Sequence, residues 1–221
     1  MPEKQKVFSK IFTAALALML AAQVILMLLP GFGPGGAEFH LTAAALEAVL
    51  ALGASAAGTG RFDGKKLLRL LFTIYSIHLI GVLFFDGSFG RTPGDARAEW
   101  FSVNLTPFAT IANYWVKWRQ GLVGTRVAVT NLLGNILAFA PMGVLLPLIG
   151  KKPWGFLKTA FTGAALIALA EVLQWYFGVG SCDIDDFILN FAGLLAARAC
   201  LCLPCFRKTM GRKTPPRGKK G

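Results

Sequence analysis

Apolar residues are grouped along the chain in six segments that alternate with short polar stretches. The segments cover about residues 7–29, 41–58, 66–85, 127–149, 157–177 and 185–203. Each approaches the roughly 20 residues that an α-helix needs to cross the hydrocarbon core of a bilayer. The pattern therefore predicts an all-α, polytopic membrane protein with about six spanning helices. The second segment is the weakest, because it is rich in Ala and Gly and contains Glu47.

Polar side chains inside the last three segments occur as pairs on one helical face, three or four residues apart. The pairs are Asn131 with Asn135, Glu171 with Gln174, and Asp186 with Asn190. At a rise of 1.5 Å per residue, all three pairs fall in the same half of the membrane. Three helices that agree on one level predict a polar pocket between them.

An acidic cluster opens the sixth segment, where Asp183, Asp185 and Asp186 follow Cys182. Carboxylates near hydrocarbon are costly and usually mark a functional site. Simple hydrogen bonding between helices is the alternative interpretation. Such bonds contribute only about 0.6 kcal/mol each on average, which is small beside the cost of an ionised Glu171 in hydrocarbon.

Composition supports the membrane class, because 55% of the 221 residues are hydrophobic and only 15% are charged. The net charge of +12 does not indicate nucleic-acid binding, since the basic residues lie mostly in short loops and the tail. With both termini in the cytoplasm, 18 of the 23 Lys and Arg residues fall on the cytoplasmic side. The basic tail after residue 204 is expected to be disordered and to lie on anionic lipid.

The only long connection, residues 86–126, falls on the external side in this topology. Within it, residues 108–122 carry apolar side chains at steps of three and four, which predicts an amphipathic helix. Its apolar face holds Phe108, Ile111, Trp115, Trp118 and Leu122. Trp suits the membrane–water interface, so the helix is interpreted as an anchor on the bundle, with a moving lid as the alternative.

Other polar residues in the apolar segments receive structural interpretations. His78 and Glu47 are placed about 10 and 9 Å below the outer ends of their helices, and His78 is interpreted as a packing residue. Pro141 is expected to kink the fourth segment. Cys200, Cys202 and Cys205 bring no fourth ligand, so no metal site and no cofactor are predicted.

Four ordered motifs resemble those of the VanZ-like family of membrane proteins. They are Asn-Leu-Thr-Pro-Phe at 104–108; Asn-Leu-Leu-Gly-Asn at 131–135 with Phe-Ala-Pro-Met-Gly at 139–143; Glu-x-x-Gln at 171–174; and Asp-Ile-Asp-Asp at 183–186 with Asn190 and Gly193. The chain departs from many members at residues 180–182, where Gly-Ser-Cys replaces a stretch that contains Arg. Residues 1–66, with two predicted spans, and the tail at 204–221 lie outside the resemblance, which covers the domain at 67–203.

The resemblance implies a bacterial inner-membrane protein that reduces susceptibility to lipoglycopeptide antibiotics and leaves the chemistry open. Expected partners are membrane lipid, a lipid-linked envelope precursor or the lipoglycopeptide itself. An enzyme that acts on a lipid-linked substrate, with Glu171 and Asp186 as catalytic groups, is the alternative, and a small transporter is a third. The candidate ligand-binding residues are Asn104, Pro107, Phe108, Asn131, Asn135, Gln174, Asp183, Asp185 and Asn190.

Overall fold

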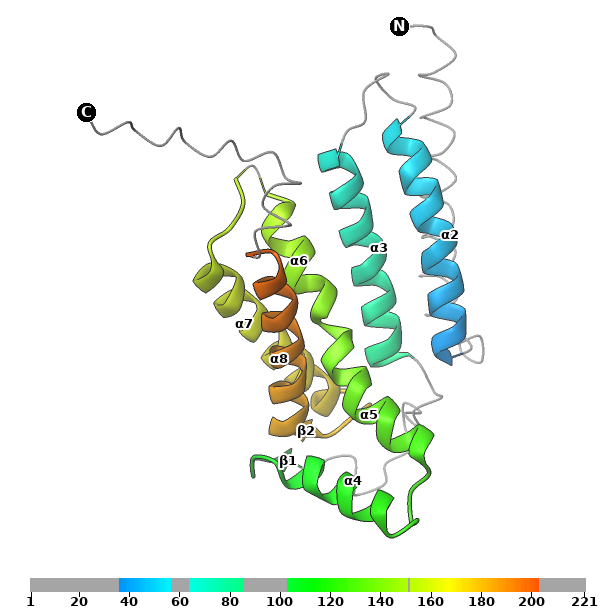
Figure 1. Cartoon of the computed structure of the whole chain (residues 1–221), viewed down its shortest axis with the longest axis vertical. Helices are drawn as coiled ribbons and strands as arrows, with labels where there is room; N and C mark the ends of the chain where they lie inside the picture. The colour runs from blue at the N-terminus through cyan, green and yellow to red at the C-terminus, as the bar shows by residue number, and fades with distance from the viewer. Residues whose placement is uncertain (1–35, 57–63, 86–102, 151, 203–221) are drawn as a thin grey trace, which may run out of the picture.

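The computed structural model describes residues 36–56, 64–85, 103–150 and 152–202. Figure 1 shows helices that run along the long axis of the molecule and one helix, α4, that crosses the end of this bundle. The helices are α2 (Gly36–Ala56), α3 (Gly64–Phe84), α4 (Ala109–Arg119), α5 (Thr125–Ala138), α6 (Ala140–Leu148), α7 (Phe156–Tyr176) and α8 (Ile184–Cys200). Two short strands, β1 (Val103–Asn104) and β2 (Cys182–Asp183), lie beside α4.

The all-α prediction is confirmed, and each predicted apolar segment within the described residues forms helix. The first predicted span and the basic tail lie outside the described residues. Within the described residues, three stretches are long and apolar enough to cross a membrane: Gly64–Phe84, Val127–Leu148 and Phe156–Tyr176. The helix α8, at 17 residues, and the apolar part of α2, Thr42–Ala54, are shorter. Six spans therefore stays a prediction.

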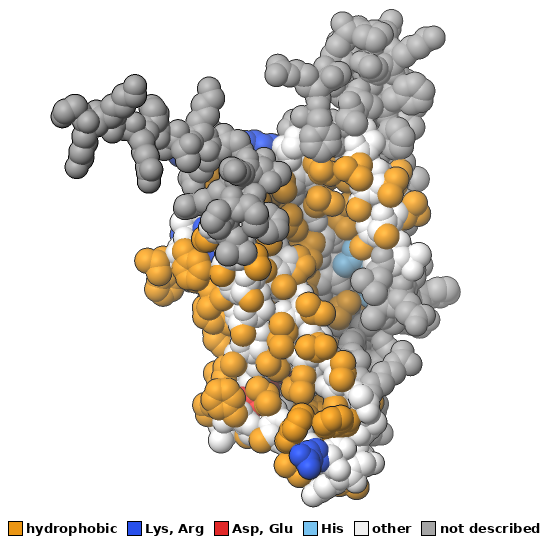
Figure 2. All heavy atoms as spheres, in the orientation of Figure 1, with side chains coloured by type: hydrophobic (Ala, Val, Ile, Leu, Met, Phe, Trp, Pro, Cys, Tyr) orange, Lys and Arg blue, Asp and Glu red, His pale blue; other side chains and the backbone are white. Residues whose placement is uncertain are grey.

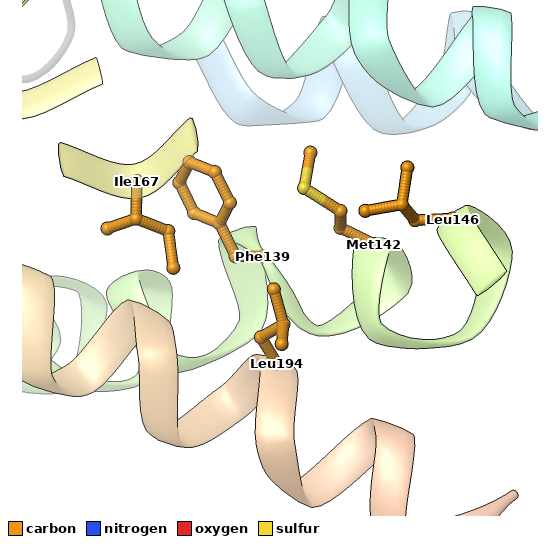
Figure 3. Close-up of a cluster of buried hydrophobic side chains, with 5 residues drawn as sticks. All are labelled: Phe139, Met142, Leu146, Ile167 and Leu194. Atoms are coloured by element: carbon orange, nitrogen blue, oxygen red, sulfur yellow. The ribbon is translucent and has the colours of Figure 1, made fainter. Parts of the chain in front are cut away.

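The predicted kink at Pro141 is present as a break between two helices. The helix α5 ends at Ala138, Phe139 links the two, and α6 begins at Ala140 with Pro141 in its first turn. Proline has no N–H to donate to the preceding turn, but it fits the first turn of a helix, where that donor is not needed. The break lies in the middle of the bundle and turns Phe139 into its core (Figure 3).

Small residues let α8 approach its neighbours closely. A Cβ at Gly193 would collide with the backbone carbonyl of Ile136 on α5, and one at Gly143 would collide with that of Leu194. Glycine at these crossings lets the backbones meet, as it does between membrane helices generally. The core formed around these contacts contains Phe139, Met142, Leu146, Ile167 and Leu194 (Figure 3).

The outer surface of the bundle is apolar, which fits contact with lipid. Large side chains point outward along its length, including Leu137, Phe161 and Leu169, each more than half exposed. Figure 2 shows the same feature as hydrophobic side chains spread over the visible face between its two ends. A water-soluble domain rarely exposes apolar surface this continuously.

Candidate functional site

The start of α8 is joined to the segment before α4 by a two-residue parallel sheet. Val103 pairs with Cys182, and Asn104 pairs with Asp183. The side chain of Asp183 also caps α8, since its Oδ1 accepts a hydrogen bond from the backbone N–H of Asp185 at 2.9 Å. The acidic motif and the Asn-Leu-Thr-Pro-Phe motif, 79 residues apart in the chain, therefore form one unit.

The carboxylate of Asp185 binds the amino-terminal end of α4. It accepts hydrogen bonds from the backbone N–H groups of Phe108, Thr110 and Ile111, with N···O distances of 2.5, 2.7 and 3.0 Å. Phe108 precedes the helix in the left-handed region, at φ 64°, and supplies no side-chain cap. The first N–H groups of a helix have no partner within it and favour a negative charge. Asp185 is fully buried, so it acts as the missing cap from a distant helix.

Asn104 and Thr110 complete this outer network around Asp183. The side-chain amide of Asn104 donates to Asp183 Oδ1 at 3.1 Å and to the hydroxyl of Thr110 at 3.0 Å. The hydroxyl of Thr110 donates to Asp183 Oδ2 at 2.6 Å. We call these four residues, Asn104, Thr110, Asp183 and Asp185, the clamp. Sequence analysis did not identify Thr110, although a Thr in the first turn of a helix is a usual hydrogen-bonding residue.

The predicted residues Pro107 and Phe108 lie at the exposed edge of the clamp. The ring of Phe108 is 61% exposed, so its contribution to the clamp comes from its backbone N–H. Both side chains are therefore exposed at this end of the bundle, and the polar side-chain contacts of the clamp are made by Asn104 and Thr110.

A second polar group lies on the bundle side of the clamp. Asn135 on α5 donates its side-chain amide to Asp186 on α8. Asn190 follows Asp186 by one helical turn and is buried, and its Oδ1 receives no hydrogen bond from any residue that the structure describes. Asn131, by contrast, donates to the carbonyl of Val127 in its own helix at 2.9 Å. The structure thus brings Asn135 and Asp186 together, buries Asn190 one turn away and turns Asn131 to its own helix.

Glu171 and Gln174 are buried on α7, at 6% and 5% exposure. Gln174 donates to the carbonyl of Leu83 at the end of α3, at 3.1 Å. Gly180 lies against the Gln174 side chain, where an added Cβ would approach Gln174 Cβ to 3.4 Å. The departure from the family pattern at residues 180–182 therefore falls directly beside this pair.

Electrostatics connects Glu171 with β2. Burial raises the pKa of the Cys182 thiol, and the charges of Glu171 and Asp183 raise it further. Cys182 is therefore close enough to both carboxylates for their charges to affect its thiol. We call Asn135, Glu171, Gln174, Asp186 and Asn190 the inner polar group.

The clamp carboxylates are occupied by donors from the protein itself. Within the described residues, no group of three or more His, Cys, Asp or Glu side chains has the arrangement needed to hold a metal ion. Asp183 and Asp185 accept these hydrogen bonds from the Asn104 side chain and from residues 108–111.

An apolar groove of about 200 Å³ adjoins this end of the bundle, between α4 and α5. Trp115 and Trp118 lie on one wall with ring centroids 5.2 Å apart, and Trp118 Nε1 donates to the hydroxyl of Thr125 at 3.0 Å. The remaining lining residues are Tyr114, Ala128, Val129, Leu132 and Leu133. The predicted helix is confirmed at Ala109–Arg119, which is shorter than the predicted 108–122, so Phe108 precedes it and Leu122 follows it. Trp115 and Trp118 line the groove against α5.

Comparison with known proteins covers the same part of the chain. The model of the VanZ/LLP1 family matches residues 72–204. Protein VanZ of Enterococcus faecium is 30% identical over 131 residues, which are 59% of this chain and 70% of that protein. No solved structure matches the chain. The matched region includes the clamp and the inner polar group and leaves out α2.

Proposed function

Because the chain belongs to the VanZ/LLP1 family, we propose that it is a bacterial membrane protein that lowers susceptibility to teicoplanin-like lipoglycopeptides. The family match carries this proposal, since it includes every candidate site residue from Asn104 to Asn190. The long apolar helices and their exposed apolar side chains support action within a membrane.

The proposed place of action is the outer leaflet of the cytoplasmic membrane, at the end of the bundle that α4 covers. The distribution of Lys and Arg supports this orientation, because it puts both termini in the cytoplasm and the loop before α4 outside. Clusters of Lys and Arg on the cytoplasmic side would also hold the tail on anionic lipid.

The proposed ligand is amphipathic, such as a lipid, a lipid-linked envelope precursor or the lipoglycopeptide. The inner polar group would bind the polar part, and Asn190 Oδ1 would accept a hydrogen bond from a hydroxyl or amine. The apolar groove between α4 and α5 would accommodate part of an acyl chain. A small set of placed polar groups beside an apolar surface is typical of ligand sites.

An enzyme that modifies a lipid headgroup is the second candidate, and the burial of Glu171 favours it. Glu171 is 6% exposed and lies close enough to act electrostatically on Cys182. A buried carboxyl beside a polar pocket can serve as a general acid or base. In that reaction Glu171 would exchange a proton with the substrate, and Asp186 would orient the substrate.

The test is the antibiotic susceptibility of a sensitive bacterium that expresses the chain, with a lipoglycopeptide and a glycopeptide without an acyl chain. Protection against the lipoglycopeptide should be lost in Glu171→Gln and in Asp186→Asn at unchanged protein levels. Thr73→Val removes a polar group from the exposed side of α3, where Thr73 bonds only its own helix, and should keep full protection. Full protection in both site variants would contradict the proposed site.

Mass spectra of membrane lipids separate the two candidates. A binder leaves the lipid species unchanged, whereas an enzyme produces a new mass that disappears in Glu171→Gln. Absence of protection by the native chain itself would contradict the function and not merely the site.

A further inference from the structure

Three titratable side chains form a continuous hydrogen-bonded chain between α2 and α3. Glu47 Oε2 lies 2.9 Å from His78 Nε2, and His78 Nδ1 lies 3.0 Å from His40 Nδ1. The two imidazole rings meet edge to face, with centroids 5.3 Å apart. Both ring nitrogens of His78 are therefore engaged, and His78 joins the other two groups.

This chain is enclosed in the apolar interface of the two helices. The exposed fractions of Glu47, His40 and His78 are 0%, 4% and 7%. Ala51 and Ile74 form the buried core of the same interface, with Ala44, Leu50, Leu67 and Leu70 packed against it. An uncompensated charge in such surroundings is costly, so the three groups should keep a net charge of zero together.

Zero net charge fixes the number of protons. Each of the two hydrogen bonds needs one proton, and His40 Nε2 holds a third. With protons on Glu47 Oε2, His78 Nδ1 and His40 Nε2, all three groups are neutral. With protons on His78 Nε2 and on both nitrogens of His40, Glu47 is a carboxylate and His40 an imidazolium. The net charge is zero in both arrangements.

One concerted shift converts the first arrangement into the second. The Glu47 proton moves from Oε2 to His78 Nε2, and the His78 Nδ1 proton moves to His40 Nδ1. No heavy atom needs to move, His78 exchanges one neutral tautomer for the other, Glu47 becomes a carboxylate and His40 an imidazolium. Side-chain chains of this kind carry protons in membrane proteins.

We infer that His40, His78 and Glu47 are a proton relay between α2 and α3, and that its ligand is the proton. Glu47 lies near the middle of α2, and His40 lies seven residues earlier, about 10 Å closer to the helix end by the helical rise. That end of α2 and the adjoining end of α3 face the side of the molecule on which α4 lies (Figure 1). The relay therefore moves protons between mid-bundle and the end that holds the polar site.

The charged groups of α3 lie toward the start of that helix, away from His78. Lys65, Lys66 and Arg69 lie in the first two turns of α3, and Arg69 is nine residues, about 13 Å, from His78. Tyr75 points to α5, where its hydroxyl donates to the carbonyl of Ala138 at 2.7 Å.

Among the described helices, further titratable groups lie earlier in α2 or on helices other than α2 and α3. The helix α6 has none in its sequence. On α7, Lys158 lies over the ring of Trp154, Tyr176 ends the helix, and Glu171 acts on Cys182. Glu38, two residues before His40, is the other acid in the sequence of α2.

The test is nitrogen NMR of the full chain, labelled at histidine and reconstituted in lipid. The chain has two histidines, so the spectrum contains four ring nitrogens. The relay predicts a scalar coupling across Nδ1–H···Nδ1 and, because the shift moves protons at both rings at once, a simultaneous change of the ring-nitrogen shifts of both histidines when the temperature is varied. Absence of the coupling from the native spectrum, or independent changes at the two rings, would overturn the relay without use of any variant.

Variants test the contribution of Glu47. Glu47→Gln keeps the shape and removes the proton donor, so His78 Nε2 should change its shift and the imidazolium form of His40 should disappear. The protonated carboxyl band of Glu47 in infrared spectra should be lost as well. Glu171→Gln removes a carboxyl on α7, outside the relay, and should leave all four nitrogens unchanged. Identical histidine spectra in Glu47→Gln and the native chain would overturn the proposal.

Discussion

Asp185 shows how one buried carboxylate organises the end of the bundle. Its two oxygens accept three backbone N–H groups that α4 cannot satisfy itself. A hydrogen bond to a charged group contributes about 1.5–3 kcal/mol, roughly twice a neutral one. The negative charge of Asp185 therefore stabilises the position of α4. The neighbouring Asp186 instead accepts a hydrogen bond from Asn135 of the inner polar group.

Asp185→Asn should weaken the docking of α4. An amide at this position keeps one acceptor but turns an NH₂ group toward backbone N–H donors, so at least one of them loses its partner. We expect a loss of about 2–3 kcal/mol in the free energy of unfolding, measured by denaturation in detergent. Asp186→Asn is the matched control, because its remaining oxygen still accepts from Asn135. Equal losses in both variants would contradict the capping role.

Cys182 should react slowly with alkylating reagents at neutral pH. Its pKa is raised by burial, by Glu171 and by Asp183, and only the thiolate reacts. The rate should rise with pH until the raised pKa is passed. Glu171→Gln removes one cause and lowers the pKa, so the rate at pH 7 should increase. The measurement uses a background in which Cys200, Cys202 and Cys205 are Ser.

Glu38→Gln is the control for the reactivity of Cys182, and its rate should equal that of the native chain. An unchanged rate in Glu171→Gln would mean that the charge of Glu171 does not reach the thiol. The alkylation rate can be measured without any activity of the protein. The experiment therefore tests the geometry around Cys182 separately from the proposed function.

Spacing along the chain indicated which polar side chains share a helix face but not which partners they bind. The i, i+4 pair of Asp186 and Asn190 does face the bundle, and Asp186 meets Asn135. Asn131 has the same spacing to Asn135, but its short side chain reaches the carbonyl four residues earlier. His78 was interpreted as a packing residue because its partners, His40 and Glu47, lie on a different helix.

At the scale of elements, hydrophobic segments predicted the helices, because burial and length determine them. The break at Phe139 followed from Pro141. The pairing of β1 with β2 could not be predicted, since two-residue strands carry no periodic pattern and depend on contacts 79 residues apart. The spacing of the polar pairs could be seen in the sequence, whereas the clamp, which joins segments 79 residues apart, could not.

Gly193→Ala should separate α8 from α5. Alanine in a helix is normally favourable by about 1 kcal/mol over glycine, but here its Cβ would collide with the backbone carbonyl of Ile136. Overpacking of this kind costs about 1–3 kcal/mol. The variant should therefore lower the thermal midpoint in detergent.

Gly134→Ala on the neighbouring helix α5 provides the control for this crossing. A Cβ at Gly134 meets no atom within 4 Å, so this substitution should keep or raise the thermal midpoint. A more stable Gly193→Ala protein would mean that α5 and α8 are not in backbone contact.

At the scale of the whole molecule, two polar systems occupy different helices of one bundle. The clamp and inner polar group lie within the family match at 72–204, whereas two of the three relay residues lie on α2, before it. The helix α3 connects the systems, because His78 belongs to the relay and the carbonyl of Leu83 accepts from Gln174. A change in α3 packing at the relay would therefore reach the inner polar group over little more than one helical turn.

Orientation in the membrane decides which leaflet the polar end faces. The Lys and Arg residues are divided 18 to 5 between the two sides when the termini are cytoplasmic, and such an excess determines orientation. A reporter fused after Lys208 should read as cytoplasmic, and one inserted near Gly94 should read as external. Replacing the four basic residues Arg61, Lys65, Lys66 and Arg69 with Gln should weaken the bias and produce a mixed signal. An external tail in the native chain would turn the α4 end toward the cytoplasm, and the proposed action at the outer leaflet would then be wrong.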